Sequence, residues 1–200
     1  MAKQRYSFTG ATIEFSYGGK TIILHQIKAE QTFNIDEYHG ISCGDIGGWI
    51  EKESNLKQEG QAWVGKDAYM FGDAVVSGKA FVFGKTKIHG HATIKGNARV
   101  FAQAEVSGRA TVCGDAHVYG RARIYGKAKI DGKAQIYDEA KVYDDAHVTD
   151  DAEVYEEASI YEQATLKDRS KAYGHSEVLG TTTLSLGLRA SGTIRMGAKK

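Results

Sequence analysis

The chain has 200 residues and a formal net charge of +1, from 26 Lys and Arg against 25 Asp and Glu, so its overall charge does not point to a polyanionic partner. Its two cysteines, Cys43 and Cys113, lie far apart without a CxxC spacing, which argues against a disulfide framework or a zinc site. With no apolar run of about 18 residues and no secretory signal, we expect a cytoplasmic protein, of a bacterium or an infected cell, that does not enter a membrane.

Residues 1–59 do not repeat, and we predict that they form an N-terminal capping region. Within it, "ATIEFSYGGKTIILHQIKA" places two alternating apolar and polar runs on either side of Gly18 and Gly19. This pattern is typical of a β-hairpin with a short turn.

A repeat of six residues begins at Ala62. Every sixth position from Ala62 to Thr182 is small, and 17 of these 21 positions are alanine. Two residues later, from Val64 to Leu184, 20 of 21 positions are Val, Ile, Leu or Met. Two residues before the small position, 13 of 21 are glycine and six are Asp or Glu.

The spacing of these positions predicts short strands joined by corners. Residues i and i+2 of a strand point to the same face, so the small and the aliphatic residue both point inward. Glycine at the corner supplies a positive φ, which Asp tolerates better than most residues. Glu156 and Glu162 fit this less well, and we expect a neighbouring corner residue to take the strain there. A helix is excluded because glycine at every sixth residue would break it. The pattern therefore predicts an all-β parallel solenoid.

The small and aliphatic positions from Ala62 onward resemble the left-handed β-helix of hexapeptide-repeat proteins. The resemblance implies three hexads for each coil and a triangular cross-section with a narrow interior. The sequence departs from the family in placing glycine two residues after the aliphatic position, where the family usually has it one residue after. That departure weakens a transfer of function more than a transfer of fold.

Residues 44–64, "GDIGGWIEKESNLKQEGQAWV", resemble the segment that precedes the repeats in phage and prophage hexapeptide proteins. Those proteins are often named transferases or acetyltransferases by analogy to the fold, which is an association and not a mechanism.

We predict that the β-helix spans residues 60–197, with about seven coils between Ala62 and Leu184, and that residues 198–200 form a basic tail. An open end of such a fold exposes apolar interior and unpaired strand groups, so residues 1–59 are expected to cover it. The expected plugging residues are Trp49, Ile50 and Leu56, and the sharper alternative is that they form a binding site.

The last hexads are expected to keep the same parity with larger residues inside. The inward pairs would be Leu188 with Ala190 and Ile194 with Met196, and Gly192 would lie at a corner.

Residues 18 apart should lie above one another, and the position after each aliphatic residue then forms columns. The first column is Gly65, Phe83, Phe101, Tyr119, Tyr137, Tyr155 and Tyr173. The second is Phe71, His89, Ser107, Tyr125, Tyr143, Tyr161 and Leu179. The third is Ser77, Lys95, Cys113, Asp131, Thr149, Lys167 and Ser185, which is mostly polar. This sorting supports three sides and places two aromatic ladders on the outside.

The ladders and an acidic band are the predicted binding surfaces. Between residues 134 and 163 there are ten acidic residues and one basic residue, Lys141, and the acids would surround two coils. The candidate binding residues are Tyr119, Tyr137, Tyr155, Tyr173, Tyr125, Tyr143, Tyr161, Asp144, Asp145, Asp150, Asp151, Glu156 and Glu157. Simple stacking along the solenoid is the alternative for the tyrosines, and a solvated face that discourages aggregation is the alternative for the acids.

The sequence shows no catalytic site. The weak candidates for a general base are His89, His117 and His147, of which His117 and His147 have no evident carboxylate partner in the sequence. We expect no metal and no cofactor, since no Walker loop, GxSxG or HExxH motif is present.

The leading hypothesis is a non-catalytic, rigid binding or assembly scaffold of phage type. It would contact a host or phage protein, with anti-defence activity as one form of that role, and nucleic acid is a disfavoured partner. A homo-oligomer, trimer or dimer, is compatible with the resemblance. The alternatives are an acyl-CoA-dependent acyltransferase of the hexapeptide class and a protein that binds a nucleotide between protomers.

Overall fold

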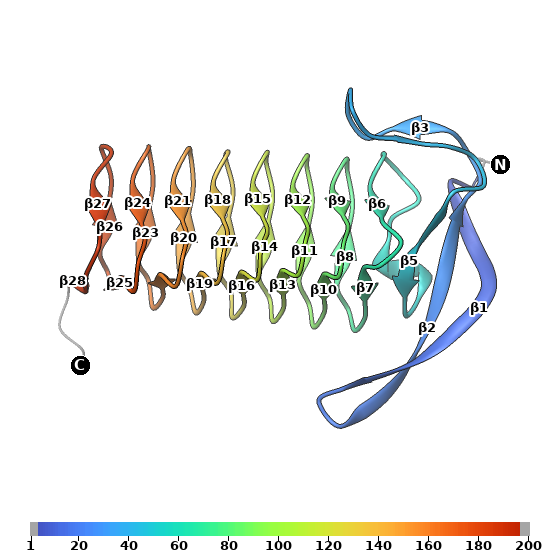
Figure 1. Cartoon of the computed structure of the whole chain (residues 1–200), viewed down its shortest axis with the longest axis horizontal. Coiled ribbons are helices and arrows are strands. Elements are labelled where there is room, and N and C mark those ends of the chain that lie inside the picture. Colours follow the sequence, from blue (N-terminus) through green and yellow to red (C-terminus); the bar gives the residue numbers. More distant parts are fainter. Residues whose placement is uncertain (1–3, 197–200) are drawn as a thin grey trace.

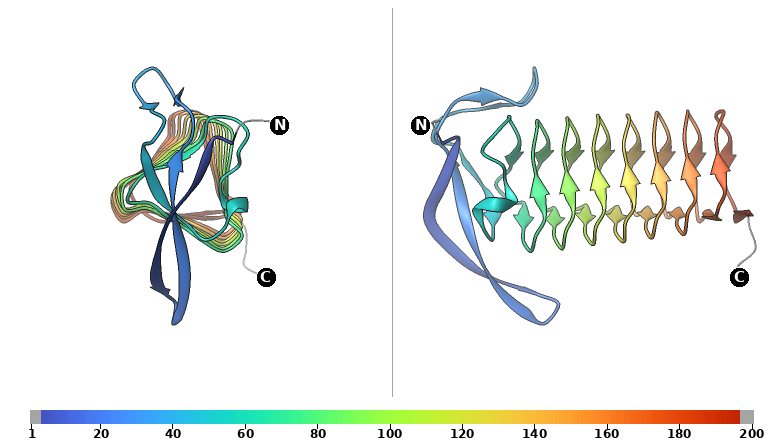
Figure 2. Two further views of the ribbon diagram at one scale, coloured as in Figure 1. Left: turned by 90° about the vertical axis from the view of Figure 1, so that its right-hand side faces the viewer. Right: turned by 180° about the vertical axis from the view of Figure 1, so that it is seen from behind.

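The structure is a computed structural model that describes residues 4–196, and it is built from strands apart from one 3-10 turn at Glu53–Asn55. The N-terminal strands are β1 (Tyr6–Tyr17), β2 (Lys20–Ala29), β3 (Phe33–Asn34), β4 (Gly40–Ile41) and β5 (Ile46–Ile50). The later strands stack in three sheets, which are the three sides of a solenoid (Figures 1 and 2).

We name the sides face 1, face 2 and face 3, in the order in which the chain passes through them. Face 1 contains β1, β2, β5, β7 (Tyr69–Met70), β10 (Lys87–Ile88), β13 (Glu105–Val106), β16 (Arg123–Ile124), β19 (Lys141–Val142), β22 (Ser159–Ile160), β25 (Glu177–Gly180) and β28 (Ile194–Met196). Face 2 contains β8 (Val75–Val76), β11 (Thr93–Ile94), β14 (Thr111–Val112), β17 (Lys129–Ile130), β20 (His147–Val148), β23 (Thr165–Leu166) and β26 (Thr183–Leu184). Face 3 contains β6 (Trp63–Val64), β9 (Phe81–Val82), β12 (Arg99–Val100), β15 (His117–Val118), β18 (Gln135–Ile136), β21 (Glu153–Val154), β24 (Lys171–Ala172) and β27 (Arg189–Ala190).

Each repeat strand pairs in parallel with the strand 18 residues further along the chain. Lys87 and Ile88 pair with Glu105 and Val106, for example. Three hexads therefore make one turn, and the predicted three-sided parallel solenoid is confirmed. Residues 4–196 contain about eight turns, one more than the sequence count, because parallel pairing already begins at Ile50 with Met70 and at Leu56 with Val76.

The interior is filled by the small and aliphatic positions of the repeat. From Ala62 to Leu166 these side chains have no measurable exposure, including Thr86, the one residue at a small position of this range that is not alanine. The backbone of each coil is bonded to the next, as where the Thr93 N–H donates to the Ala110 carbonyl oxygen at 2.9 Å. The hexad thus supplies both the apolar core and the coil-to-coil hydrogen bonds.

Positive φ occurs at nearly every corner, as the glycine pattern predicts. Six acidic residues take the same conformation, and they are Asp138, Asp144, Asp150, Glu156, Glu162 and Asp168. The expectation for Glu156 and Glu162 was wrong, because these residues adopt the positive φ themselves, at 56° and 59°. At Glu156 the strain is offset by the carboxylate, which accepts the Gly174 N–H at 2.6 Å.

The predicted β-hairpin is present, with Tyr17 paired to Lys20 around Gly18 and Gly19. Strand β2 continues face 1 by pairing antiparallel with β5. Figure 1 shows the hairpin extending across the N-terminal end and down beside the first coils.

The N-terminal end of the interior is closed partly as predicted. Ile50 and Leu56 are fully buried. Trp49 is only partly buried, because it pairs with Tyr69 at an outward position. Trp63 is also at an outward position but is buried, with its ring packed against Phe33 of the N-terminal region, and Ile27 is buried in the same apolar cluster. Whether residue 60 marks a domain boundary stays a prediction.

The last turn departs from the expected register. Ile194 pairs with Val178 and Met196 with Gly180, so this turn is two residues shorter than the others. Leu186 and Gly187 take the positive φ, and Gly192 does not.

The expected inward pairs of the last turn are therefore wrong in part. Ala190 is buried, but Leu188 is 56% exposed and Met196 60% exposed. Met196 does not point inward because the shortened turn pairs it with the corner residue Gly180. The predicted tail at 198–200 lies outside the described residues. No helix between residues 4 and 196 is long and apolar enough to cross a membrane.

Candidate functional site

Face 3 carries one continuous aromatic column. Its rings are Phe83, Phe101, Tyr119, Tyr137, Tyr155 and Tyr173, in that order. Neighbouring ring centroids are 4.9 to 5.5 Å apart, and the ring planes are within 12° of parallel. The predicted stacking is confirmed, and the rings are half-buried, so their edges form a strip on the surface.

Face 1 carries a second column that is interrupted. Phe71 stacks on His89 at 4.9 Å, and Tyr125, Tyr143 and Tyr161 stack at 4.8 and 4.9 Å. Ser107 lies between the two groups and has no ring. The stack on this face therefore lacks one member at its centre.

Burial raises the pKa of tyrosine hydroxyls in both columns still further above neutral pH. It raises the pKa of Tyr143 to about 12 and also raises that of Tyr137, where the charge of Glu153 adds to the effect. The Tyr137 hydroxyl donates to Glu153 at 3.3 Å. The columns thus present protonated phenols beside acceptor groups.

Most of the predicted acidic band is used by the solenoid itself. Asp144 and Asp150 accept the backbone N–H of the corner one coil further on, at 3.3 and 3.1 Å. Asp145 pairs with Lys127 at 3.6 Å, and Glu157 pairs with His175 at 3.3 Å. These acids are therefore less available to a partner than their number in the sequence indicates.

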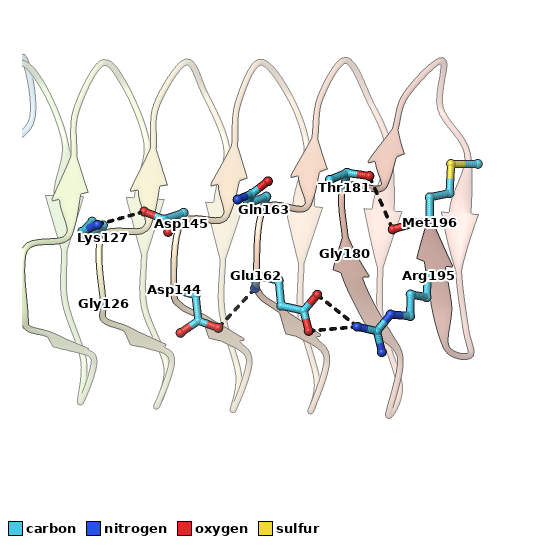
Figure 3. Close-up of a pocket in the computed structure, with 10 residues that line it drawn as sticks. All are labelled: Gly126, Lys127, Asp144, Asp145, Glu162, Gln163, Gly180, Thr181, Arg195 and Met196. Carbon is cyan, nitrogen blue, oxygen red and sulfur yellow. Dashed lines mark hydrogen bonds and ion pairs between the residues drawn. The ribbon is translucent and has the colours of Figure 1, made fainter. Parts of the chain in front are cut away.

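A hollow of about 560 Å³ lies near the C-terminal end of face 1 (Figure 3). Glu162 pairs there with Arg195 at 3.2 Å, and Lys127 points toward Asp145. The Thr181 hydroxyl donates to the Met196 carbonyl oxygen at 3.4 Å. Because its charged groups pair with one another, this hollow offers little charge to a ligand.

The three candidate histidines lie on different faces and do not form one site. His89 follows β10 on face 1, His117 lies on β15 of face 3, and His147 lies on β20 of face 2. Burial, with the charge of Arg99, lowers the pKa of His117. The structure therefore brings no two of them together.

The expectation that His147 has no carboxylate partner was wrong. Its Nε2 lies 3.0 Å from Asp131, on the coil before. Although burial raises the pKa of Asp131, hydrogen bonds from Lys129, Thr149 and His147 lower it to about 2. His89 and Glu105 form a similar pair at 2.9 Å. In each pair the two residues are 16 apart in the sequence, so they lie diagonally across neighbouring coils. A search for residues 18 apart, which lie directly above one another, does not find them.

Tyr17 is a site residue that sequence reasoning missed. It lies at the tip of the hairpin, and its ring packs against Phe71 and His89 with centroids 5.1 and 4.7 Å away. Its hydroxyl donates to Glu105 at 2.6 Å. Burial and this bond raise the pKa of Tyr17 to about 12, while the His89 hydrogen bond is the main reason that the pKa of Glu105 falls to about 2. The hairpin tip is thus fixed to the side of the coils that contain β7, β10 and β13.

A second N-terminal arm holds the start of the face 3 column. It runs from β3 to β4, and Figure 2 shows it beside the opposite side of the solenoid from the hairpin tip. Asp36 on this arm pairs with Arg99 and with His39, and the His39 ring packs edge-on against Phe81 at 5.4 Å. Each aromatic column therefore begins under an arm of the N-terminal region.

No cluster of three His, Cys, Asp or Glu side chains suited to a metal ion occurs in the part of the chain that the structure describes. The fold defines the class of the protein, a parallel β-solenoid with an N-terminal hairpin. A scan against protein-family models finds no match to the chain, and a search of curated proteins finds none either.

Proposed function

We propose that this chain is a non-catalytic, rigid binding scaffold that holds a protein partner against the face 3 aromatic column. The observation that carries the proposal is the unbroken strip of rings from Phe83 to Tyr173, whose first ring lies 6.4 Å from the His39 ring of the N-terminal arm. Half-buried tyrosines are suited to interfaces because they offer a large contact area with few rotatable bonds.

Mixed charge beside the strip supports the same role. A hollow of about 570 Å³ on face 3 is lined by Arg99, His117, Lys133, Asp151 and Glu153, among others. Asp151 is thus a member of the predicted acidic band that lies beside this column. Charges placed around an aromatic strip favour one partner over others.

The resemblance of the N-terminal region to phage proteins indicates where such a scaffold would act. Residues 44–64 resemble the head of phage and prophage hexapeptide proteins, which supports a phage-type protein that acts in the bacterial cytoplasm. Binding a component of the host defence is one action that such a scaffold performs without chemistry. No observation favours the acyltransferase alternative, since the candidate histidines lie on three faces.

The experiment compares capture of partners from a host lysate by variants that lose the same number of rings on different faces. Tyr137→Ser with Tyr155→Ser should abolish capture, because it removes the middle of the face 3 strip. The matched control is Tyr143→Ser with Tyr161→Ser on face 1, which should retain it. A third variant, Tyr137→Phe with Tyr155→Phe, keeps the stacked rings and separates loss of the hydroxyls from loss of the strip.

Circular dichroism should show that each variant stays folded. Equal capture by the two serine variants, whether full or lost, would contradict the proposal, because neither result depends on face 3. Light scattering on the wild-type protein gives the oligomeric state, which stays a prediction.

A further inference from the structure

We propose that face 1 holds a second site, centred on Ser107, that binds a small planar aromatic anion of the nucleoside monophosphate class. This site lies on a different face from the strip assigned above and stands independently of the scaffold function.

The first observation is the interruption of the face 1 column. Rings on this face repeat at 4.8 to 4.9 Å. Leaving out the ring at Ser107 therefore separates His89 from Tyr125 by about 10 Å, which is two steps of the strand spacing. One aromatic ring fits between them at normal stacking distances on both sides. The serine thus leaves a slot that is one ring thick.

The second observation is a hollow beside the slot, which shares Ser107 and Tyr125 with it. It has a volume of about 550 Å³ and is lined by Tyr17, Lys87, Glu105, Ser107, Arg123, Tyr125 and Lys141. This volume lies in the range of small-molecule sites. Tyr17 at the hairpin tip and Tyr125 on the solenoid give it aromatic walls from two elements far apart in the sequence.

The third observation is the positive charge of this hollow. Lys87, Arg123 and Lys141 line it, and within residues 4–196 none of them forms an ion pair with a carboxylate. Lys87 lies 5.5 Å from the centre of the Tyr17 ring. The one acid in the lining, Glu105, is already held by Tyr17 and His89. The cations are therefore available to an anion.

The chemistry of the lining selects the ligand. A purine or pyrimidine base stacks on tyrosine through its π-face, whichever base it is. Arginine binds a phosphate through two parallel N–H groups, and lysine adds a point charge. A nucleoside monophosphate joins both features in one small molecule, so we assign that class to the slot.

The wall formed by Tyr17 is set before a ligand arrives. The hydroxyl of Tyr17 donates to Glu105, and its ring rests on Phe71 and His89. Because these contacts already hold the Tyr17 side chain in place, it loses little conformational entropy when a ligand binds, and this favours affinity.

The test is isothermal titration calorimetry with three probes: adenosine monophosphate, adenosine and inorganic phosphate. Adenosine monophosphate should bind saturably at one site per chain, and each of the other two should bind at least about tenfold more weakly, a loss of about 1.4 kcal/mol. Phosphate binding as tight as that of the nucleotide would overturn the proposal, because it would show an anion site without stacking. So would the absence of saturable binding by the nucleotide.

Two variants locate the site. Ser107→Tyr fills the slot with a ring of the protein's own, so it should abolish binding and raise the melting temperature by completing the stack. Its matched control is Ser77→Tyr, at the same position of a hexad on face 2, which should bind like the wild type. Arg123→Gln with Lys141→Gln changes exposed side chains without altering the stack and should weaken the nucleotide by about tenfold or more. Unchanged binding by Ser107→Tyr or by the double glutamine variant would contradict the assignment.

Discussion

Ser176 and Ser170 occupy the same inward position of neighbouring hexads, but their hydroxyls meet different surroundings. The single hydroxyl proton of Ser170 has two acceptors within reach, the carbonyl oxygens of Lys167 at 2.8 Å and Leu184 at 3.1 Å from Oγ. Ser176 Oγ is buried and has no hydrogen-bond partner among residues 4–196. A buried hydroxyl without a partner loses its hydration and regains nothing. The same small residue is therefore stabilising in one hexad and costly in the next.

We predict that Ser176→Ala raises the free energy of unfolding by about 1 kcal/mol, because it removes the unpaired hydroxyl and keeps the volume of the interior. Ser170→Ala should lower it by about 1 kcal/mol, since the hydrogen bond donated by a buried hydroxyl is lost. Urea unfolding monitored by circular dichroism measures both values. A stability change of the same sign in both variants would show that the interior treats the two hydroxyls alike.

At the scale of elements, the hairpin is joined to the solenoid through a titratable contact. Glu105 accepts from the Tyr17 hydroxyl and pairs with His89, and its pKa is lowered from 4.5 to about 2, chiefly by the His89 hydrogen bond. A carboxyl whose pKa is lower in the folded state stabilises the fold above its unfolded pKa. That contribution is lost as the pH falls through the folded value.

We therefore predict that the stability difference between the wild type and Glu105→Gln is full above about pH 4.5 and disappears toward pH 2. Glutamine keeps the size of the side chain and removes the charge, so the difference isolates the contact. Thermal unfolding at a series of pH values measures it. A difference that stays constant over this range would mean that the Glu105 carboxylate does not hold the hairpin tip.

The elements themselves were largely predictable, because the hexad encodes them locally. The inward pairs, the glycine corners and the hairpin at Gly18 and Gly19 each follow from spacing within a few residues. The contact of Tyr17 with His89 and Glu105 could not be predicted, since it depends on how the hairpin bends over the first coils. The short last turn also could not be predicted, because the chain keeps the 18-residue register as far as Ala190 and then reaches Ile194 without the positive-φ corner expected at Gly192. The left-handed winding, which the resemblance implied, stays a prediction.

At the scale of the whole molecule, the interior is one narrow column, and each coil is supported by the coils above and below it. The chain makes its stabilising contacts between neighbouring turns, so its stability is close to a sum over coils and their interfaces. A defect in one central coil then weakens the contact on both of its sides. The alanines at the small positions are sensitive to such a defect because they are fully buried on all three faces.

We predict that Ala128→Leu lowers the free energy of unfolding by about 1–3 kcal/mol or more, because a larger side chain must displace a backbone that is hydrogen-bonded to the preceding coil. The Ala128 carbonyl oxygen accepts the Thr111 N–H at 2.9 Å, so a displaced backbone also strains that bond. The matched control is Lys127→Leu, one residue earlier, where the side chain is exposed and its ion pair with Asp145 is 3.6 Å long. Melting temperatures of the two variants should differ by several degrees. Equal melting temperatures would mean that the centre of the solenoid has room for a leucine. That result would contradict a narrow interior, and with it the assignment of residues to three faces.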